Sequence, residues 1–259
     1  MAFKNVDYVI HAAALKYVDI AEYNPIEFVK TNILGSQNVS LAAIETGVKK
    51  VILLSTDKAV NPVNLYGSTK LVAEKLISSS NTYTTNGKTK LSVVRYGNVF
   101  NSRGSVIPKF QLLKKANKDL PITNKDMTRF FLTVEDSIKF VINCLNLMQG
   151  GEIFIPKCKT IKIVDLAKAI SKKSKIKIVG IRPGEKIHES LISRDEAALV
   201  IEYRNFYCLI SRSNAKLMKI FNKTKSRKGK LIKPFDYSSN NNSFLSIKDI
   251  EVILKKISI

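Results

Sequence analysis

Hydrophobic and polar positions along the chain follow two periods, one typical of buried strands and one of amphipathic helices. Short apolar runs that resemble buried parallel strands occur at Val6–Ala12, Lys50–Leu54 and Leu91–Tyr96. Between and after these runs the apolar positions recur at helical spacing. Helices are predicted at about Pro25–Thr46, Tyr66–Ser79, Ile107–Ala116 and Thr133–Met148. This alternation predicts an α/β fold built on a parallel sheet.

Several titratable side chains follow the second predicted strand. Ser55–Lys58 comes directly after the apolar run that ends at Leu54, and open α/β sheets bind ligands at the carboxyl ends of their strands. Tyr66 and Lys70 then lie four residues apart, on one face of a helix. A nearby ammonium favours the phenolate, so a phenol with a pKa of about 10 can become a base near neutrality. The pattern favours a site for multistep proton transfer, although a solvated helix face has the same Tyr-x-x-x-Lys spacing.

The whole segment Ser55–Lys70 resembles the short-chain dehydrogenase/reductase superfamily, in its extended, sugar-nucleotide-modifying branch. It is most similar to the inverting UDP-N-acetylglucosamine 4,6-dehydratases of the CapD/PseB polysaccharide-biosynthesis type. Related retaining dehydratases typically carry Asp-Glu where this chain has Asp57-Lys58, and related epimerases usually lack the charged pair. The resemblance therefore favours an inverting dehydratase over an epimerase.

Four further segments match the same family in the same order, so the resemblance covers nearly the whole chain. They are His11–Lys16, Val94–Val106, Met127–Phe130 and Ile181–Glu189. The resemblance implies a Rossmann-type, doubly wound parallel sheet with a smaller α/β substrate-binding lobe. The expected domains are residues 1–150 for the NAD(P)-binding part and 151–222 mainly for the lobe, interleaved with residues 98–132. Residues 223–259 are expected to form a basic loop and the C-terminal segment.

The start of the chain differs from the layout of this family. No Gly-rich turn of the dinucleotide-binding kind occurs near the N-terminus, and about 70–80 residues of strands and helices would precede Met1 in the family. We expect the chain to be an N-terminally truncated fragment. A second polypeptide that supplies the missing half, or a degenerate and inactive relative, are the alternatives.

The implied activity is a lyase reaction that regenerates its own NADP or NAD in each turnover. The enzyme oxidises C4 of a UDP-sugar, removes water across C5 and C6, and returns the hydride to C6 with inversion at C5. Family members supply pseudaminic acid, capsule and other surface glycans with such products. A homo-oligomer is implied by the resemblance alone. The odd number and wide spacing of the cysteines favour free thiols in the cytoplasm. The discriminator between NAD and NADP is not found in this sequence.

The resemblance also assigns catalytic roles. Tyr66 would remove the proton of the sugar 4-hydroxyl, and Lys70 would bind the nicotinamide ribose and stabilise the phenolate. Lys58 would handle the C5 proton, which requires a lowered pKa, and Asp57 would protonate the departing hydroxyl. Thr56 would hydrogen-bond the 4-oxygen. An alternative for Asp57 and Lys58 is a positioning ion pair.

The resemblance also implies which residues bind the cofactor and the substrate. Besides Tyr66 and Lys70, the expected cofactor-binding residues are Ala12, Ala13, Lys16 and Tyr96. The expected substrate-binding residues are Lys16, Asn98, Arg103, Ser105, Arg129, Arg182 and Glu185. The two small alanines would let the dinucleotide approach the backbone. The arginines would grip the diphosphate, because a planar guanidinium makes bidentate contacts with phosphates.

Composition adds constraints rather than new sites. The formal net charge is +22, which raises the alternative of a nucleic-acid binder. The lysines are scattered, however, and the densest basic run, Lys223–Lys230, has no interleaved aromatic residues for base stacking. Three widely spaced cysteines and two histidines do not form metal-ligand spacings. We therefore expect no nucleic acid, no metal and no membrane span, with a 4-epimerase or a truncated pseudoenzyme or subunit as rival functions.

Overall fold

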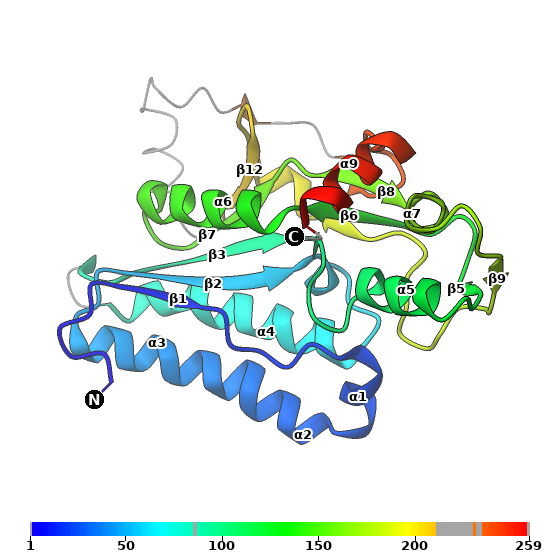
Figure 1. The fold of residues 1–259 in the computed structure, drawn as a ribbon. Helices are drawn as coiled ribbons and strands as arrows, with labels where there is room; N and C mark the ends of the chain where they lie inside the picture. Colours follow the sequence, from blue (N-terminus) through cyan, green and yellow to red (C-terminus); the bar gives the residue numbers. More distant parts are fainter. Residues whose placement is uncertain (1, 85–86, 211–229, 232–234, 258–259) are drawn as a thin grey trace.

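The computed structural model describes residues 2–84, 87–210, 230–231 and 235–257 of the chain (Figure 1). The predicted basic run Lys223–Lys230 lies outside the described residues except for its last position. The described part contains a large mixed sheet with helices on both faces. A second group of smaller sheets and helices lies beyond the carboxyl ends of the parallel strands (Figure 1).

Among the described residues, the large sheet has the strand order β1-β2-β3-β7-β12-β11-β13. The first four strands are parallel and the remaining three are antiparallel to their neighbours. The strands are β1 (Tyr8–His11), β2 (Lys50–Thr56), β3 (Lys90–Tyr96), β7 (Glu152–Pro156), β12 (Phe206–Ile210), β11 (Val200–Glu202) and β13 (Lys230–Leu231). The predicted parallel strands and the α/β class are confirmed, while the antiparallel extension was not predicted.

Helices cover both faces of this sheet, as a doubly wound fold requires. On one face lie α3 (Gly35–Thr46) and α4 (Leu65–Ser79), and on the other lies α6 (Val134–Leu147) (Figure 1). Short helices precede α3 and connect the strands. They are α1 (Val18–Tyr23), α2 (Pro25–Phe28), η2 (Asp57–Ala59), η3 (Ser80–Thr82) and η5 (Ala197–Leu199).

The helix predicted over Pro25–Thr46 is interrupted by a π-helical stretch, η1 (Val29–Leu34). π-bulges are frequent at functional sites. Here the stretch buries Asn32, whose side-chain oxygen accepts from the Leu15 amide at 2.8 Å. The Asn32 amide nitrogen donates to the Leu15 carbonyl and to Thr69 Oγ1, both at 3.0 Å. The loop after β1 is thereby fixed to helix α4.

The second group of elements has its own apolar core, formed by side chains that include Phe110, Ile161, Leu166 and Ile250. Its strands pair as β4-β6-β8, β5-β9 and β10-β14. The strands are β4 (Asn98–Val99), β5 (Leu120–Ile122), β6 (Thr128–Leu132), β8 (Lys159–Lys162), β9 (Ile176–Ile178), β10 (Ser190–Ile192) and β14 (Tyr237–Ser238). The helices are α5 (Val106–Lys115), α7 (Ile163–Ile170) and α9 (Ile247–Ile257). We call this group the second lobe.

The division between the two parts differs from the predicted boundary at residue 150. Strands β7, β11 and β12 belong to the large sheet rather than to the second lobe. The physical reason is burial: in β7, Ile153, Phe154 and Ile155 are all at most 5% exposed, so this strand needs cover on both faces. Residues 98–132 form β4, α5, β5 and β6.

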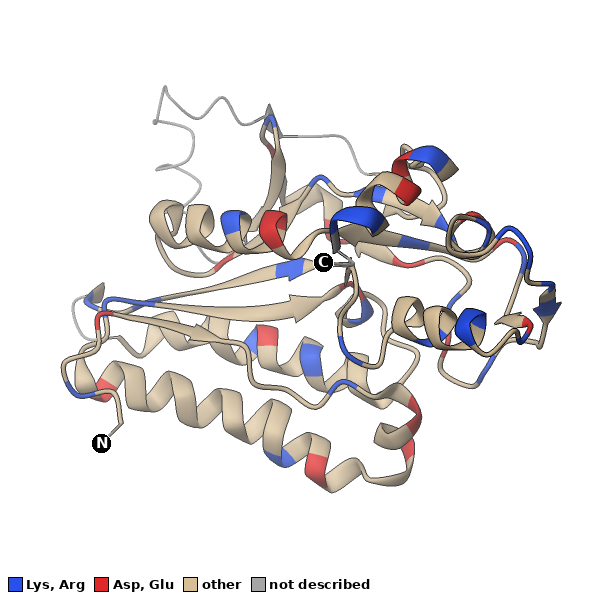
Figure 2. Cartoon of the chain, in the orientation of Figure 1, with Lys and Arg blue, Asp and Glu red and all other residues tan. Residues whose placement is uncertain are grey.

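Charge is spread over both parts of the molecule, with Lys and Arg on the large sheet's helices and on the second lobe (Figure 2). This distribution fits the scattered lysines of the sequence. None of the described helices combines the length and the apolar composition that a bilayer crossing requires.

Candidate active site

The candidate site begins where β2 ends. Thr56 closes the strand, and its hydroxyl accepts a hydrogen bond from the Lys58 amide at the start of η2. Asp57 is 1% exposed, and its Oδ1 accepts from Thr56 Oγ1 at 2.9 Å. The apolar strand thus delivers three polar residues to the carboxyl edge of the sheet, where this fold class binds ligands.

Helix α4 packs unusually closely on this turn. A Cβ atom added at Gly67 would lie 2.2 Å from the Lys58 carbonyl oxygen, so only glycine fits there. Asn64 caps the helix by accepting from the Gly67 amide at 2.7 Å. The close approach places Tyr66, which is 9% exposed, against Thr56 and Lys58.

Burial raises the pKa of Tyr66 to about 12, although the Lys58 charge and a hydrogen bond with Thr56 act in the opposite direction. The protein groups alone therefore do not bring the pKa of Tyr66 near neutrality, as the interpretation of the sequence requires. The ammonium that favours the phenolate here is that of Lys58 rather than that of Lys70. Desolvation outweighs it, because Tyr66 lies in a tightly packed position.

Lys70 lies one helical turn further along α4 and is 3% exposed. Its Nζ donates to the Leu54 carbonyl at 2.8 Å. Burial lowers the pKa of Lys70 to about 8, with the Glu74 charge acting in the opposite direction. Tyr66 and Lys70 are thus both buried at one end of β2, as the four-residue spacing predicted.

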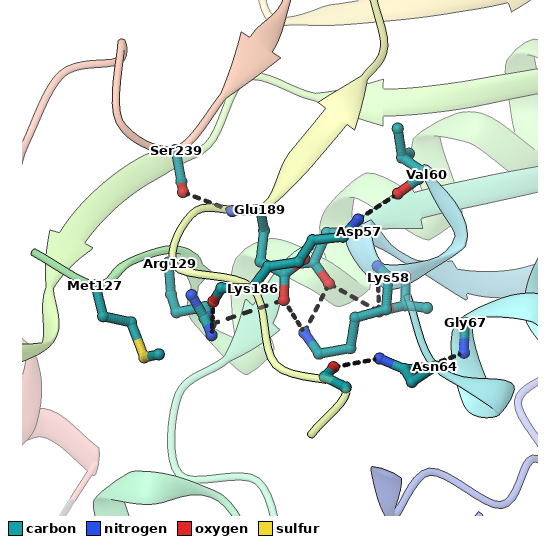
Figure 3. A network of polar contacts seen from close by, with 12 residues as sticks. Asp57, Lys58, Val60, Asn64, Gly67, Met127, Arg129, Lys186, Glu189 and Ser239 are labelled. Atoms are coloured by element: carbon teal, nitrogen blue, oxygen red, sulfur yellow. Dashed lines mark hydrogen bonds and ion pairs between the residues drawn. The ribbon is translucent and has the colours of Figure 1, made fainter. Parts of the chain in front are cut away.

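Lys58 lies in a different environment, between two carboxylates (Figure 3). Its Nζ is 3.1 Å from Asp57 Oδ1 and 3.1 Å from Glu189 Oε1. Burial by itself lowers the pKa of Lys58, but the two carboxylates outweigh it and the net pKa is raised. A base at this position would need a lowered pKa, so these surroundings favour an ammonium at rest, and the role of Lys58 at the C5 proton stays a prediction.

Glu189 belongs to the loop that runs from Arg182 to the start of β10. Arg129, on β6, holds this loop with guanidinium hydrogen bonds of 2.9 and 2.7 Å to the carbonyls of Ile187 and Lys186, and a third, of 2.7 Å, goes to the Thr128 carbonyl on its own strand. The Arg129 Nε also lies 3.8 Å from Glu189 Oε1. Most donors of this guanidinium are therefore used within the protein, which limits its predicted grip on a diphosphate.

The same loop is bonded to the β2–α4 connection at two further points (Figure 3). Asn64 Nδ2 donates to the Gly184 carbonyl at 2.8 Å, and Lys186 Nζ donates to the Val60 carbonyl at 2.7 Å. Together with the Lys58–Glu189 pair, these bonds join the second lobe to the carboxyl end of β2. We refer to residues 182–189 as the bridging loop.

A cavity of about 230 Å³ lies beside the bridging loop. Five of the predicted substrate-binding residues line it: Asn98, Ser105, Arg129, Arg182 and Glu185. Sequence reasoning missed several other lining residues, among them Lys109, Phe110, Ile122, Thr123 and Met127. They come from α5 and β5 and from the turn before β6. The predicted Arg103 and Lys16 are exposed and do not line this cavity.

Unpaired polar atoms are concentrated around this region. Asn98 Oδ1 and Ser105 Oγ, in residues that line the cavity, are buried and have no hydrogen-bond partner within the described structure. The same holds for Asp57 Oδ2 and Glu189 Oε2, on either side of Lys58. Native proteins rarely leave buried polar atoms unpaired without a reason. A polar ligand that reaches both places would satisfy them.

The predicted cofactor side lies at the carboxyl end of β1, which is an edge strand among the described residues. Ala12 and Ala13 follow this strand and are exposed, as is Lys16. Tyr96 ends β3 and is half-buried, and burial raises its pKa. The two exposed alanines and the exposed Lys16 are compatible in size and charge with a dinucleotide such as NAD or NADP on this side.

Sequence reasoning gave no role to four residues that organise the site: Asn32, Asn64, Lys186 and Glu189. Three of them lie in segments that carry the family resemblance, which signals importance but not function. Their roles depend on contacts between distant segments, such as Lys58 with Glu189, which no local pattern reveals.

The family model described as "Polysaccharide biosynthesis protein" matches residues 1–211. The UDP-N-acetylglucosamine 4,6-dehydratase (inverting) of Campylobacter jejuni subsp. jejuni serotype O:2 is 50% identical over 249 residues, which cover 93% of this chain and 73% of that protein. The UDP-glucose 4-epimerase of Rickettsia bellii is 42% identical over 258 residues, with 98% and 75% coverage. Both similarities span most of the site just described.

Solved structures agree with these similarities. The X-ray structure of Pen from Bacillus thuringiensis superimposes with a TM-score of 0.89 at 36% identity, covering 99% of this chain and 77% of that one. The dTDP-glucose 4,6-dehydratase DesIV from Streptomyces venezuelae, solved with NAD and TYD bound, has a TM-score of 0.65 at 20% identity, with 72% and 64% coverage. This second likeness concerns the fold, which is of the Rossmann type.

Proposed function

The chain belongs to the family of polysaccharide biosynthesis proteins, and from this premise we propose that it is a nucleotide-sugar 4,6-dehydratase that acts on UDP-N-acetylglucosamine with inversion at C5. The 50% identity to an enzyme of that name supports the proposal. So does the buried Asp57–Lys58 pair against Tyr66, which is the one structural observation that carries it. Removal of water needs a proton donor and a proton acceptor in addition to the Tyr66 base.

Tyr66 would take the proton of the sugar 4-hydroxyl, assisted by Thr56 at the 4-oxygen. With a pKa of about 12 the phenol is protonated at neutral pH, so a further positive influence is needed to make it a base. Bound NAD or NADP would accept and return the hydride, and its oxidised ring is cationic. Ala12, Ala13, Lys16, Tyr96 and Lys70 are the residues we propose to hold it.

The 4-ketone acidifies the proton at C5, and the roles of Asp57 and Lys58 follow from their charge states. A charged Lys58 can donate a proton but cannot accept one. We therefore assign Lys58 to protonate the departing C6 hydroxyl, and Asp57, whose Oδ2 has no partner within the described structure, to take the C5 proton. These assignments exchange the two roles implied by the sequence resemblance.

The cavity beside the bridging loop is the proposed site for the UDP moiety. Arg182 offers an exposed guanidinium to the diphosphate, and Glu185 offers a carboxylate to ribose or uracil donors. Asn98 and Ser105 bring buried polar atoms that need partners. We retain Arg103 as a proposed substrate residue from the loop next to the cavity, and Arg129 as the residue that positions the bridging loop.

The test is proton NMR of the protein with UDP-N-acetylglucosamine in heavy water, with NAD or NADP supplied. The expected product is a 4-keto-6-deoxy sugar with deuterium at C5 and inverted C5 configuration. Tyr66→Phe is the matched variant, because it removes only the phenolic oxygen, and we expect its rate to fall by about 10²- to 10⁴-fold. A folded protein that binds the substrate but releases no dehydrated product would contradict the proposal.

A 4-epimerase is the second candidate, favoured by the 42% identity to an enzyme of that name. It predicts a 4-epimer in which C6 keeps its hydroxyl and C5 keeps its proton. The same NMR spectrum separates the two functions. We further propose that the product enters surface-glycan synthesis and that the protein acts as a homo-oligomer, both by analogy with the family.

A further inference from the structure

Glu189 is the second carboxylate on Lys58 and is supplied by the second lobe (Figure 3). Its side chain is 2% exposed, and its Oε1 lies 3.1 Å from Lys58 Nζ. Its backbone is fixed as well. The Glu189 amide donates to Ser239 Oγ at 3.0 Å, and the Glu189 carbonyl accepts from the Ser239 amide at 2.8 Å. Desolvation of a carboxylate is costly. A buried carboxylate on a backbone fixed by hydrogen bonds therefore indicates a specific role.

We propose that Glu189 is a positioning residue of the reaction, which holds the Lys58 ammonium beside Asp57 and Tyr66 from across the junction between the two lobes. This inference rests on the proposed function and deepens it. Asp57 alone cannot fix the ammonium, because it is the neighbouring residue on the same turn and contacts Lys58 from one side. Glu189 supplies the second contact point, and two points restrict the flexible lysine side chain far more than one.

The charges around Lys58 determine how strongly Glu189 stabilises its ammonium form. Asp57 and Glu189 stabilise its charged form, and Arg129 opposes it. Loss of the Glu189 charge would leave one carboxylate against burial and Arg129. The groups that face Lys58 from the elements packed around it are Asp57 on η2, Tyr66 on α4, Arg129 on β6, and Lys186 and Glu189 on the bridging loop.

The two ends of the bridging loop contact different parts of the site, the cavity and Lys58. Arg182 and Glu185 line the cavity at one end of this loop, and Glu189 contacts Lys58 at the other. Arg129 holds the middle through two hydrogen bonds to the Lys186 and Ile187 carbonyls, which remain when only its longer 3.8 Å contact with the Glu189 carboxylate is lost. A change confined to the Glu189 carboxylate should therefore reduce kcat and leave KM nearly unchanged.

The experiment compares Glu189→Gln, Glu189→Asp and the wild type, with Glu135→Gln as the control. Glu135 is an exposed carboxylate on α6 that pairs with Lys139 and is remote from Lys58 in the sequence and in the contacts described. The first readout needs no turnover. In protein labelled with ¹⁵N at lysine Nζ, the Lys58 signal is assigned by its loss in Lys58→Arg, and the exchange of its ammonium protons with water is measured at one near-neutral pH.

We expect the Lys58 ammonium protons to exchange with water at least about 10-fold faster in Glu189→Gln, because one charged contact is lost, and at an unchanged rate in Glu135→Gln. In the kinetic arm we expect kcat to fall by about 10²-fold in Glu189→Gln, KM to change by less than about 2-fold, and Glu189→Asp to recover part of the rate. Melting temperatures are measured for every variant, and Glu189→Asp keeps the test decisive if Glu189→Gln does not fold.

An unchanged rate of Lys58 proton exchange in Glu189→Gln would overturn the inference, as would a rise in KM at constant kcat. The NMR arm keeps this outcome distinct from failure of the proposed function. A wild-type protein that never dehydrates UDP-N-acetylglucosamine contradicts the proposed function, whereas the Lys58 exchange rate still decides whether Glu189 holds the ammonium.

Discussion

Lys58, which is partly buried, and Lys70, which is buried, belong to one candidate site, yet their surroundings act on them in opposite directions. Lys70 lies between α4 and β2 and bonds a backbone carbonyl, so burial lowers its pKa to about 8. Lys58 lies at the junction of the two lobes, where burial also lowers its pKa but Asp57 and Glu189 outweigh it. The charge of a buried lysine is therefore set by whether another part of the chain supplies carboxylates.

The largest expected effect comes from removing each ammonium in turn. Lys58→Met leaves the buried Asp57 carboxylate without its ion-pair partner and the buried Glu189 carboxylate with only the longer Arg129 contact, so we expect the free energy of unfolding to fall by about 3–5 kcal/mol. Lys70→Met replaces a poorly solvated ammonium with an apolar side chain of similar length, so we expect a change of no more than about 1 kcal/mol. Denaturant unfolding of both variants at pH 7 measures the two changes in the free energy of unfolding. Equal losses would show that the surroundings of the two lysines do not act on them differently.

The next effect is the pH dependence of stability. The pKa of Lys70 is about 8 in the folded protein and about 10.5 when unfolded, so the unfolded state binds more protons between these values. Stability should therefore rise as the pH increases from 8 to 10.5, by up to about 3 kcal/mol from this group. Lys58 has the opposite sign, because its raised pKa stabilises the charged folded form, and this contribution is lost only as the pH rises through that value.

The Lys70 contribution is isolated by the difference in unfolding free energy between the wild type and Lys70→Met, measured at pH 7.5 and pH 10. A difference that does not change with pH would show that Lys70 titrates normally in the folded protein.

The smallest expected effect concerns the other end of the bridging loop. Arg182→Ala removes an exposed guanidinium that lines the cavity without touching Lys58 or Glu189. We expect KM for the UDP-sugar to rise by about 10-fold, as the loss of one charged hydrogen bond implies, while kcat stays unchanged. Steady-state kinetics of Arg182→Ala and Glu189→Gln, measured together, distinguishes an effect on KM at one end of the loop from an effect on kcat at the other. A fall in kcat of Arg182→Ala would mean that substrate binding and Lys58 positioning are not independent.

The sequence was informative where the chemistry is local. Tyr66 and Lys70 are brought together by helical spacing, and Asp57 and Lys58 by the end of an apolar strand, so their meeting could be predicted without a structure. The main parallel strands and the helices that flank them follow from the same short-range periodicity.

What could not be predicted depends on contacts between distant segments. Glu189 reaches Lys58 only after the second lobe folds, and its presence reverses the sign of the pKa shift that burial alone would give. The π-helical stretch at Val29–Leu34 leaves no trace in the apolar pattern, because the helix continues on both sides of it. Strand β12 joins the large sheet from far along the chain, which no local signal specifies.

Asn64 performs two tasks with one amide group. Its oxygen caps the first turn of α4 by accepting from Gly67, while its nitrogen donates to the Gly184 carbonyl on the bridging loop. Any movement that lifts the loop away to exchange substrate for product must break the second bond but can leave the first intact. The helix that carries Tyr66 and Lys70 would keep its cap if the loop bond broke, and only a side chain with both a donor and an acceptor can make these two contacts at once.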